Sequence, residues 1–347
     1  MARPAHRRST AIALCVAALT GGPAPARADV FDLTLSRFVR APTGGAAADP
    51  STDTAALAGY RQLLSELGVG LAPRLLSPAD TIGYSGVQFE IDYGFTTISN
   101  KACASGGTAE APANQDQCPW QFGVEGGRDG AGKRTPPPDM LQTLSLTVRK
   151  GIWLPLPSFE IGAGATKLLG SSLYAVSAYA KLALHEGFHD LAIPSIALRG
   201  SALRVLGESQ IDLTLVQVDA TLSKSFGIAG TVTLVPYLGA AWLYIIPRGQ
   251  VLDVTPAHDA FRDGPNAPDL NANAVFPPSA NENISRWRLF AGLRLRYQVL
   301  VLTTDFIATA CGDFDGSCPA TGQHKGVAVP DNSPWQFSWN LAAGALF

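Results

Sequence analysis

Residues 185–189 read HEGFH, which matches the H-E-x-x-H motif. In that motif two histidines bind zinc and the glutamate activates a water molecule. The chemistry requires a helix, because a helix brings residues four apart onto one face. Gly187 weakens a helix by about 1 kcal/mol relative to alanine, and the ten preceding residues alternate with a period of two. We therefore interpret His185, Glu186 and His189 as a chance match at a strand end, and we expect neither a metal nor a cofactor.

Charged side chains recur at every second position in two other stretches. Apolar residues alternate with Arg286, Arg288, Arg294 and Arg296 in one stretch, and with Glu90 and Asp92 in the other. A period of two is that of a β-strand with one apolar and one polar face. The two stretches therefore predict strands whose polar faces carry opposite charge.

Five cysteines occur, and Cys15 lies in a short apolar stretch near the start. The other four form two local pairs, Cys103 with Cys118 and Cys311 with Cys318. Neither pair has the C-x-x-C spacing of a zinc site, and no histidine flanks them suitably. Because an exported chain enters an oxidising compartment, we expect two disulfides.

The first 28 residues have the three parts of a secretory signal peptide. Arg3, Arg7 and Arg8 precede an apolar stretch at 10–20, and an A-x-A site ends at Ala28. The apolar stretch is shorter than the roughly 20 residues that a membrane-spanning helix needs. We expect cleavage after Ala28 and export across the inner membrane. Charged residues make up 16% of the chain, below the roughly 25% of soluble domains.

Alternation with a period of two dominates the rest of the chain. It predicts about ten strands, with twelve as the alternative. The expected strands cover residues 81–98, 140–151, 159–169, 173–185, 195–207, 211–226, 231–246, 284–299, 300–310 and 335–347.

The final expected strand carries large apolar residues at Trp335, Phe337, Trp339 and Leu341 and ends on Phe347. This pattern resembles the closing strand of bacterial outer-membrane β-barrels. The resemblance implies an all-β fold, an antiparallel up-and-down transmembrane barrel, in the outer membrane of a Gram-negative bacterium. It also implies that Phe347 is part of the signal read by the barrel assembly machinery.

The connections between the expected strands agree with that architecture. The long connections at 100–139, 247–283 and 311–333, rich in Pro, Gly, Asn and Asp, all fall at one end of the barrel. The connections at the other end are short. Long outer loops and short periplasmic turns are the rule for outer-membrane barrels. We therefore predict a signal peptide at 1–28, an N-terminal extension at 29–79 and the barrel at 80–347.

The extension contains one expected helix, capped by Thr52 or Asp53 and running to about Leu67. It could plug the lumen, lie in the periplasm, or add two strands through residues 31–40 and 67–76. We favour the plug.

In such a barrel Glu90, Asp92, Arg286, Arg288, Arg294 and Arg296 line the lumen, while the apolar faces meet lipid. The arginines could form an anion-selective wall. They could also belong to a buried salt network with Glu90, Asp92, Glu160 and Asp212. Small barrels have interiors that side chains fill, which favours the network.

The sequence thus predicts an integral outer-membrane barrel that is either a narrow passive channel or a structural and surface-recognition protein. One alternative is an outer-membrane enzyme, since ten-stranded omptin-like proteases carry acidic and histidine residues at the outer rim. The chain places its histidines at the other rim, so we lean against an enzyme. A second alternative is an adhesin acting through the outer loops. The expected partners are outer-membrane lipids, the assembly machinery and an unidentified solute or surface ligand. A net charge of −2 disfavours nucleic acid.

Overall fold

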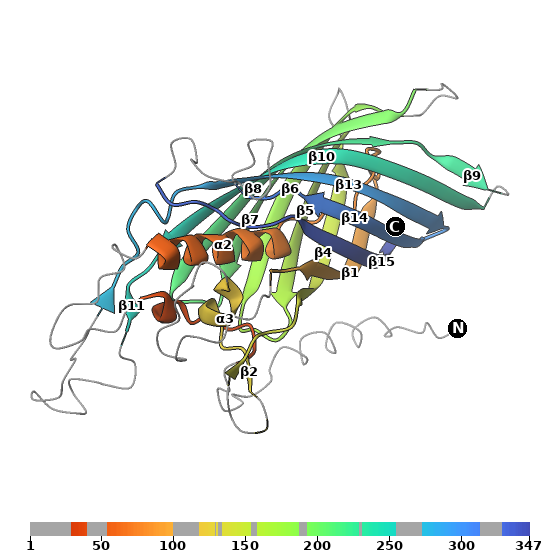
Figure 1. Ribbon diagram of the computed structural model, residues 1–347. Coiled ribbons are helices and arrows are strands. Elements are labelled where there is room, and N and C mark those ends of the chain that lie inside the picture. Colours follow the sequence, from red (N-terminus) through yellow and green to blue (C-terminus); the bar gives the residue numbers. More distant parts are fainter. Residues whose placement is uncertain are drawn as a thin grey trace, which may run out of the picture.

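The computed structural model describes residues 29–39, 54–99, 118–128, 130, 134–153, 158–186, 193–228, 231–254, 273–312 and 328–347. Within these ranges, ten long antiparallel strands form a closed barrel (Figure 1). The strands are β1 (Val87–Thr97), β4 (Met140–Ile152), β5 (Phe159–Leu168), β6 (Tyr174–His185), β7 (Ser195–Leu206), β8 (Ile211–Ser223), β10 (Val232–Gly249), β13 (Ile284–Tyr297), β14 (Leu300–Thr309) and β15 (Gln336–Leu346).

Each long strand pairs with its neighbour in the chain, and β15 pairs with β1 to close the ring. The seam extends to Phe347, whose backbone N–H and carbonyl each form a 2.9 Å hydrogen bond with Val87. Full closure leaves no unpaired strand edge, which a sheet surrounded by lipid requires. The predicted all-β fold and the count of ten are confirmed for the described part of the chain.

The remaining elements are short or lie in the extension. They are the 3₁₀ helix η1 (Leu35–Phe38), α2 (Thr54–Leu71), α3 (Pro119–Gly123), β2 (Gly127–Arg128), β3 (Arg134–Thr135), β9 (Phe226–Ile228), β11 (Leu252–Asp253) and β12 (Asn273–Ala274). No helix in the described ranges has both the length and the apolar character needed to cross a membrane.

The two ends of the barrel differ in their connections. We call the end that carries the connections at 98–139, 250–283 and 310–335 the loop end. The opposite end, with the connections at 153–158, 186–194, 224–231 and 298–299, is the turn end. Helix α2 and α3 lie at the loop end, and the C-terminus lies at the turn end (Figure 1).

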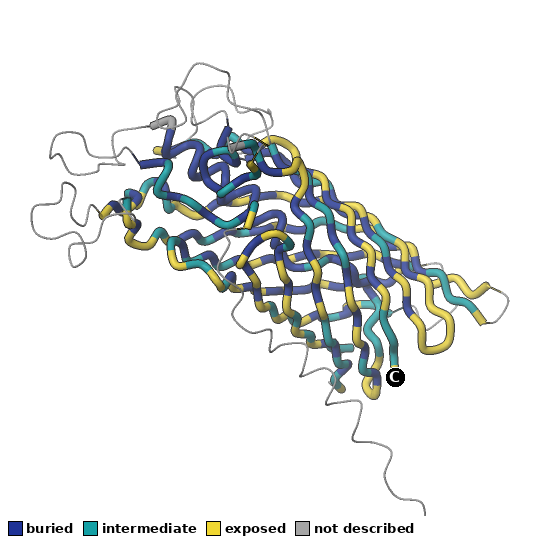
Figure 2. Tube along the Cα trace, turned by 90° about the horizontal axis from the view of Figure 1, so that it is seen from below, coloured by how far each residue is buried: buried dark blue, intermediate teal, exposed yellow. Residues whose placement is uncertain are grey.

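Exposed and buried residues alternate along the strands (Figure 2). Most of the exposed positions are apolar and form the outer surface, as the period of two predicts. This surface includes Phe89, Ile91, Trp287, Leu289, Leu293 and Trp339, which are 39–59% exposed. An apolar exterior of this extent is the surface that a lipid bilayer would cover.

The first strand is shorter than predicted. The sequence predicts a strand over 81–98, whereas β1 begins at Val87. Gly83 has a positive φ of 79°, and the N–H of Gly86 bonds to the carbonyl of Gly83 at 3.0 Å. This turn ends the extended course, so residues 80–86 continue the extension and do not belong to the barrel wall.

Replacing Leu293 with arginine should reduce the free energy of unfolding by about 2–4 kcal/mol, because the side chain lies midway along β13 on the outer face. Urea-induced unfolding in lipid vesicles measures this. Val299→Arg, at the tip of a turn-end connection, is the matched control and should cost at most about 1 kcal/mol. Equal losses at the two positions would show that the outer surface is not embedded as described.

Candidate functional site in the lumen

The N-terminal extension occupies the interior of the barrel. Helix α2 lies across the loop end, and residues 72–82 continue from it towards the turn end (Figure 1). Along this path Leu75 packs in the lumen in one apolar cluster with Tyr237, Phe290 and Ile307. Further on, the N–H of Ala79 donates to Ser223 Oγ at 3.0 Å and the N–H of Ile82 donates to Glu160 Oε2 at 3.1 Å. These contacts join the extension to the wall along its length.

Helix α2 is buried on all sides. The sequence suggests an apolar side and a polar side, yet the polar residues Arg61, Gln62, Ser65 and Glu66 are at most 5% exposed. The apolar side packs on inward-facing residues of the loop end, among them Leu141, Leu243 and Ile245. The polar side finds hydrogen-bond partners on strands and connections, so the helix fills the barrel mouth.

Arginines and a tyrosine hold α2 to the loop end. Arg286 donates to Ser65 Oγ at 2.6 Å. Arg61 donates to the carbonyl of Glu282 at 2.6 Å, and the ring of Tyr60 stacks on Phe276 with centroids 3.8 Å apart. Both the strand β13 and the connection before it therefore contact the plug.

The helix runs four residues further than Leu67, the predicted end. Two glycines allow this extension to approach the wall. A Cβ on Gly68 would lie 2.7 Å from Ile245 Cδ1, and a Cβ on Gly70 would lie 2.5 Å from Leu141 Cδ1. Glycine at these positions lets the last turn pack directly against inward-facing side chains.

Glu66 is a fully buried carboxylate surrounded by donors. It accepts hydrogen bonds from Ser99 N–H at 2.8 Å, Trp120 Nε1 at 2.8 Å and Gln62 Nε2 at 2.9 Å, and also from the Ser99 hydroxyl. Burial raises the pKa of Glu66, because desolvation outweighs these hydrogen bonds. The cluster links α2, α3 and the end of β1.

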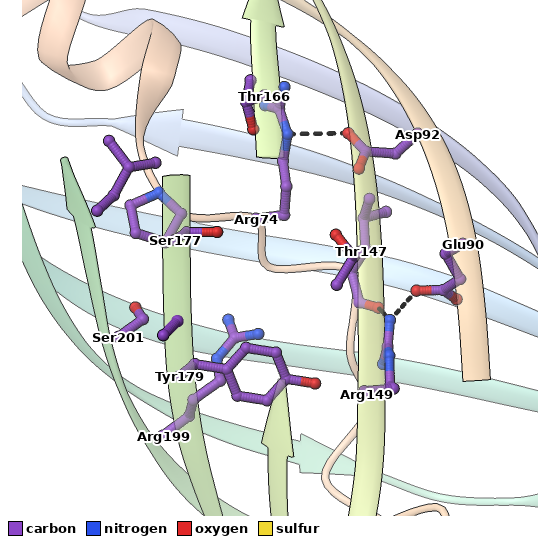
Figure 3. A pocket seen from close by; sticks show the side chains of 14 residues that line it. Arg74, Glu90, Asp92, Thr147, Arg149, Thr166, Ser177, Tyr179, Arg199 and Ser201 are labelled. Carbon is purple, nitrogen blue, oxygen red and sulfur yellow. Dashed lines mark hydrogen bonds and ion pairs between the residues drawn. The ribbon is translucent and has the colours of Figure 1, made fainter. Parts of the chain in front are cut away.

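Between α2 and the turn end, the lumen is lined by ion pairs (Figure 3). Arg74 of the extension pairs with Asp92 at 2.9 Å, and Arg149 of β4 pairs with Glu90. Two further pairs join neighbouring strands: Lys181–Glu160 at 3.2 Å and Arg199–Asp219 at 2.9 Å. Charges buried in this way are stabilised by pairing, and removing one partner leaves the other uncompensated.

The structure brings together most of the residues that the sequence assigns to the lumen. Glu90, Asp92, Arg286, Arg288 and Arg294 are all at most 8% exposed. Arg296 lies at the turn end and is exposed, next to Arg294 in a cavity that opens there. The acidic strand β1 and the arginine-rich strand β13 are not neighbours in the sheet. Their side chains come together across the lumen where Arg294 lies 3.8 Å from Glu90.

One member of the suggested salt network lies elsewhere. Asp212 alternates with the buried, inward-facing residues of β8, so its side chain faces outward. There it pairs with Arg204 at the loop-end rim. The Arg204 side chain is 50% exposed, so this pair does not belong to the lumen. The sequence hypothesis for Asp212 is therefore wrong, because at the loop end the inward positions of β8 carry the apolar residues Ile211, Leu213 and Leu215, which belong to the same apolar cluster as α2.

Six further charged residues of the described lumen were not identified from the sequence: Arg74, Arg149, Lys181, Arg199, Asp219 and Asp305. Five of them lie at inward-facing positions of their strands, and the alternation of those strands could have identified them. Arg74 has no such signal, because its segment is neither helix nor strand.

The remaining predicted sites are only partly within the described residues. His185 ends β6, and Glu186 accepts hydrogen bonds from Thr81 and from Ser158 at the turn end. His189, Cys103 and Cys318 lie outside the described ranges. Cys118 and Cys311 are each 1% exposed, and both disulfide pairings stay predictions. Among the described residues, no group of His, Cys, Asp or Glu side chains is arranged to hold a metal ion.

Replacing Arg74 with alanine should reduce the free energy of unfolding by about 3–5 kcal/mol, because Asp92 would stay buried without its cation. Arg204→Ala removes the rim pair with Asp212 and should cost less than about 1 kcal/mol. Chemical unfolding in detergent micelles compares the two variants. A similar loss in both would argue against a lumen-anchored extension.

The raised pKa of Glu66 predicts a pH dependence. The folded state retains the Glu66 proton at pH values where the unfolded chain, with an ordinary pKa of about 4.3, has lost it. Its contribution to stability should therefore fall as pH rises through the shifted pKa. Glu66→Gln should flatten this slope in pH-dependent unfolding, and the exposed Glu282→Gln is the control. An unchanged slope in Glu66→Gln would refute the assignment.

No protein-family model and no curated protein matches the chain. Solved structures that resemble it include Ail, the attachment invasion locus protein of Yersinia pestis (9% identity, TM-score 0.24, 76% of this chain and 99% of Ail). Others are Neisserial surface protein A (9%, 0.24, 75% and 94%) and Omp33 of Acinetobacter baumannii (9%, 0.23, 76% and 99%). At such identities and TM-scores these likenesses carry no argument about function. The closed ten-stranded ring with its apolar exterior confirms the predicted resemblance to bacterial outer-membrane barrels.

Proposed function

We propose that this protein is a plugged outer-membrane barrel that presents its loops and its N-terminal extension at the cell surface, and that it is not a passive pore. The observation that carries the proposal is the occupied lumen. Helix α2 is buried across the loop end, and residues 72–82 fill the space below it. A solute would have to displace both to pass.

The ion pairs of the wall strengthen this argument. An open aqueous channel of a porin has a wide lumen built from 16–18 strands. In the ten strands described here, Arg74 reaches from the extension to Asp92, and Leu75 packs against the opposite side of the lumen. The extension thus contacts the barrel wall on more than one side of the lumen. This arrangement supports a structural role.

The course of the extension supports surface display. In outer-membrane barrels the long connections are extracellular and the short turns periplasmic. Residues 29–39 contact the loop end, where Phe31 N–H bonds to the Gly170 carbonyl at 2.8 Å. The extension then returns through the lumen to start β1 at the turn end. The segment that follows the proposed signal-peptide cleavage at Ala28 would accordingly face the outside of the cell.

Conductance tests the plugged lumen directly. The purified wild type should show no stepwise current in planar bilayers, because α2 and residues 72–82 occupy the interior. A variant lacking residues 29–82, checked for barrel formation by heat-modifiable mobility on gels, is the open control. Stepwise current through the intact wild type would overturn the proposal.

Labelling of intact cells tests the sidedness. Asp29→Cys, at an exposed position of the extension, should react with a membrane-impermeant maleimide on intact cells. Val299→Cys, exposed at the turn end, should react after permeabilisation, and the wild type is the blank. The reverse pattern would contradict surface display.

The two alternatives from the sequence are less well supported. An omptin-like enzyme would need its acidic and histidine residues at the outer rim, whereas His185 lies at the turn end. Adhesion through the outer loops is compatible with surface display.

A further inference from the structure

A small polar cavity lies in the lumen between the extension and strands β1 and β4–β7 (Figure 3). Arg74, Glu90, Asp92, Arg149, Tyr179 and Arg199 are among the residues that line it, and its volume is about 30 Å³. A cavity of this size has room for a water molecule or a monatomic ion. It is too small for a sugar, a nucleotide or another organic solute.

The charges around this cavity do not balance. Arg74, Lys181 and Arg199 each pair with a carboxylate of their own, namely Asp92, Glu160 and Asp219. Glu90, in contrast, is shared by two guanidinium groups. It pairs with Arg149 and also lies 3.8 Å from Arg294. The described ion pairs around the cavity thus contain one more cation than carboxylates.

The excess charge has unused hydrogen-bond donors. Arg149 is 3% exposed, and its Nη2 atom donates to Glu90 and to the carbonyl of Leu76. Its Nε and Nη1 atoms are buried and make no hydrogen bond within the described residues. Burying donors without a partner is costly, and burying an uncompensated charge is more so. A water molecule could accept from these donors but would leave the charge in place.

We propose that this cavity binds a small monovalent inorganic anion of the chloride class at the buried guanidinium of Arg149. The anion accepts from one of the two unused donors, because the Nε–H and Nη1–H bonds of one guanidinium point away from each other, and it offsets the second guanidinium at Glu90. It lies between the extension and the wall, so its binding stabilises the plugged state. The site is independent of what the outer surface recognises.

Anion-dependent thermal unfolding tests the proposal. The full mature protein in detergent is heated in mixtures of sodium chloride and sodium gluconate at constant ionic strength. Its Tm should rise with chloride and reach a plateau, because gluconate is too large for the cavity and chloride binds the folded state. Arg294→Met leaves Arg149 and Glu90 as a one-to-one pair and should abolish most of the rise. Arg204→Met, at the rim, should keep it.

Crystals of the wild type soaked in sodium bromide provide a test that needs no variant. An anomalous bromide peak in contact with Arg149 is the expected result. No peak in the cavity, together with a Tm that does not depend on chloride, would mean that water fills it and would overturn the proposal. A chloride effect that is equal in wild type and Arg294→Met would also overturn it, since that effect would arise elsewhere.

Discussion

The pair formed by Arg74 and Asp92 shows the constraint on which the whole lumen depends: a charge that leaves water must meet an opposite charge or hydrogen bonds. Ten strands enclose more space than wall side chains fill in an eight-stranded barrel. The extension supplies the missing volume and part of the missing charge. The wall and the extension therefore form one polar network, in which buried charges of each need partners on the other.

The interior is divided along the barrel axis. At the loop end the inward positions carry Leu141, Leu243 and Ile245, which pack against α2 in a large apolar cluster. Further towards the turn end, inward positions of β1, β4 and β7 carry the charged residues Glu90, Arg149 and Arg199, and the extension changes from a helix to an irregular segment. The helix can occupy the apolar part because its backbone N–H and C=O groups are hydrogen-bonded within the helix itself. The irregular segment exposes backbone carbonyls, such as that of Leu76, and these accept from the arginines of the charged part.

Much of the barrel could be predicted because its signal is local. In β13, alternation alone indicates which residues are exposed, and the strand begins at the predicted Ile284. The course of the extension could not be predicted in this way. Arg74 and its neighbours follow no period, and their contacts are made with strands far away in the sequence. Pairing is equally non-local: Glu90 has Arg149 as a partner because β4 lies beside β1, and alternation says nothing about such neighbours. Asp212 shows a second non-local effect, since β8 turns apolar residues inward at the loop end to pack with α2, and its polar residues there face outward.

The seam between Val87 and Phe347 determines the order in which this molecule can assemble. Residues 72–82 lie inside a ring that β1 and β15 close, and β1 follows that segment directly in the chain. A folded α2 at the loop end cannot be drawn through a lumen already packed with side chains. The extension must then either enter as an unfolded chain or be in place before the last strand pairs with the first. Folding of the extension and closure of the barrel wall are thus coupled steps. The segment that fills the barrel also determines when the barrel can close.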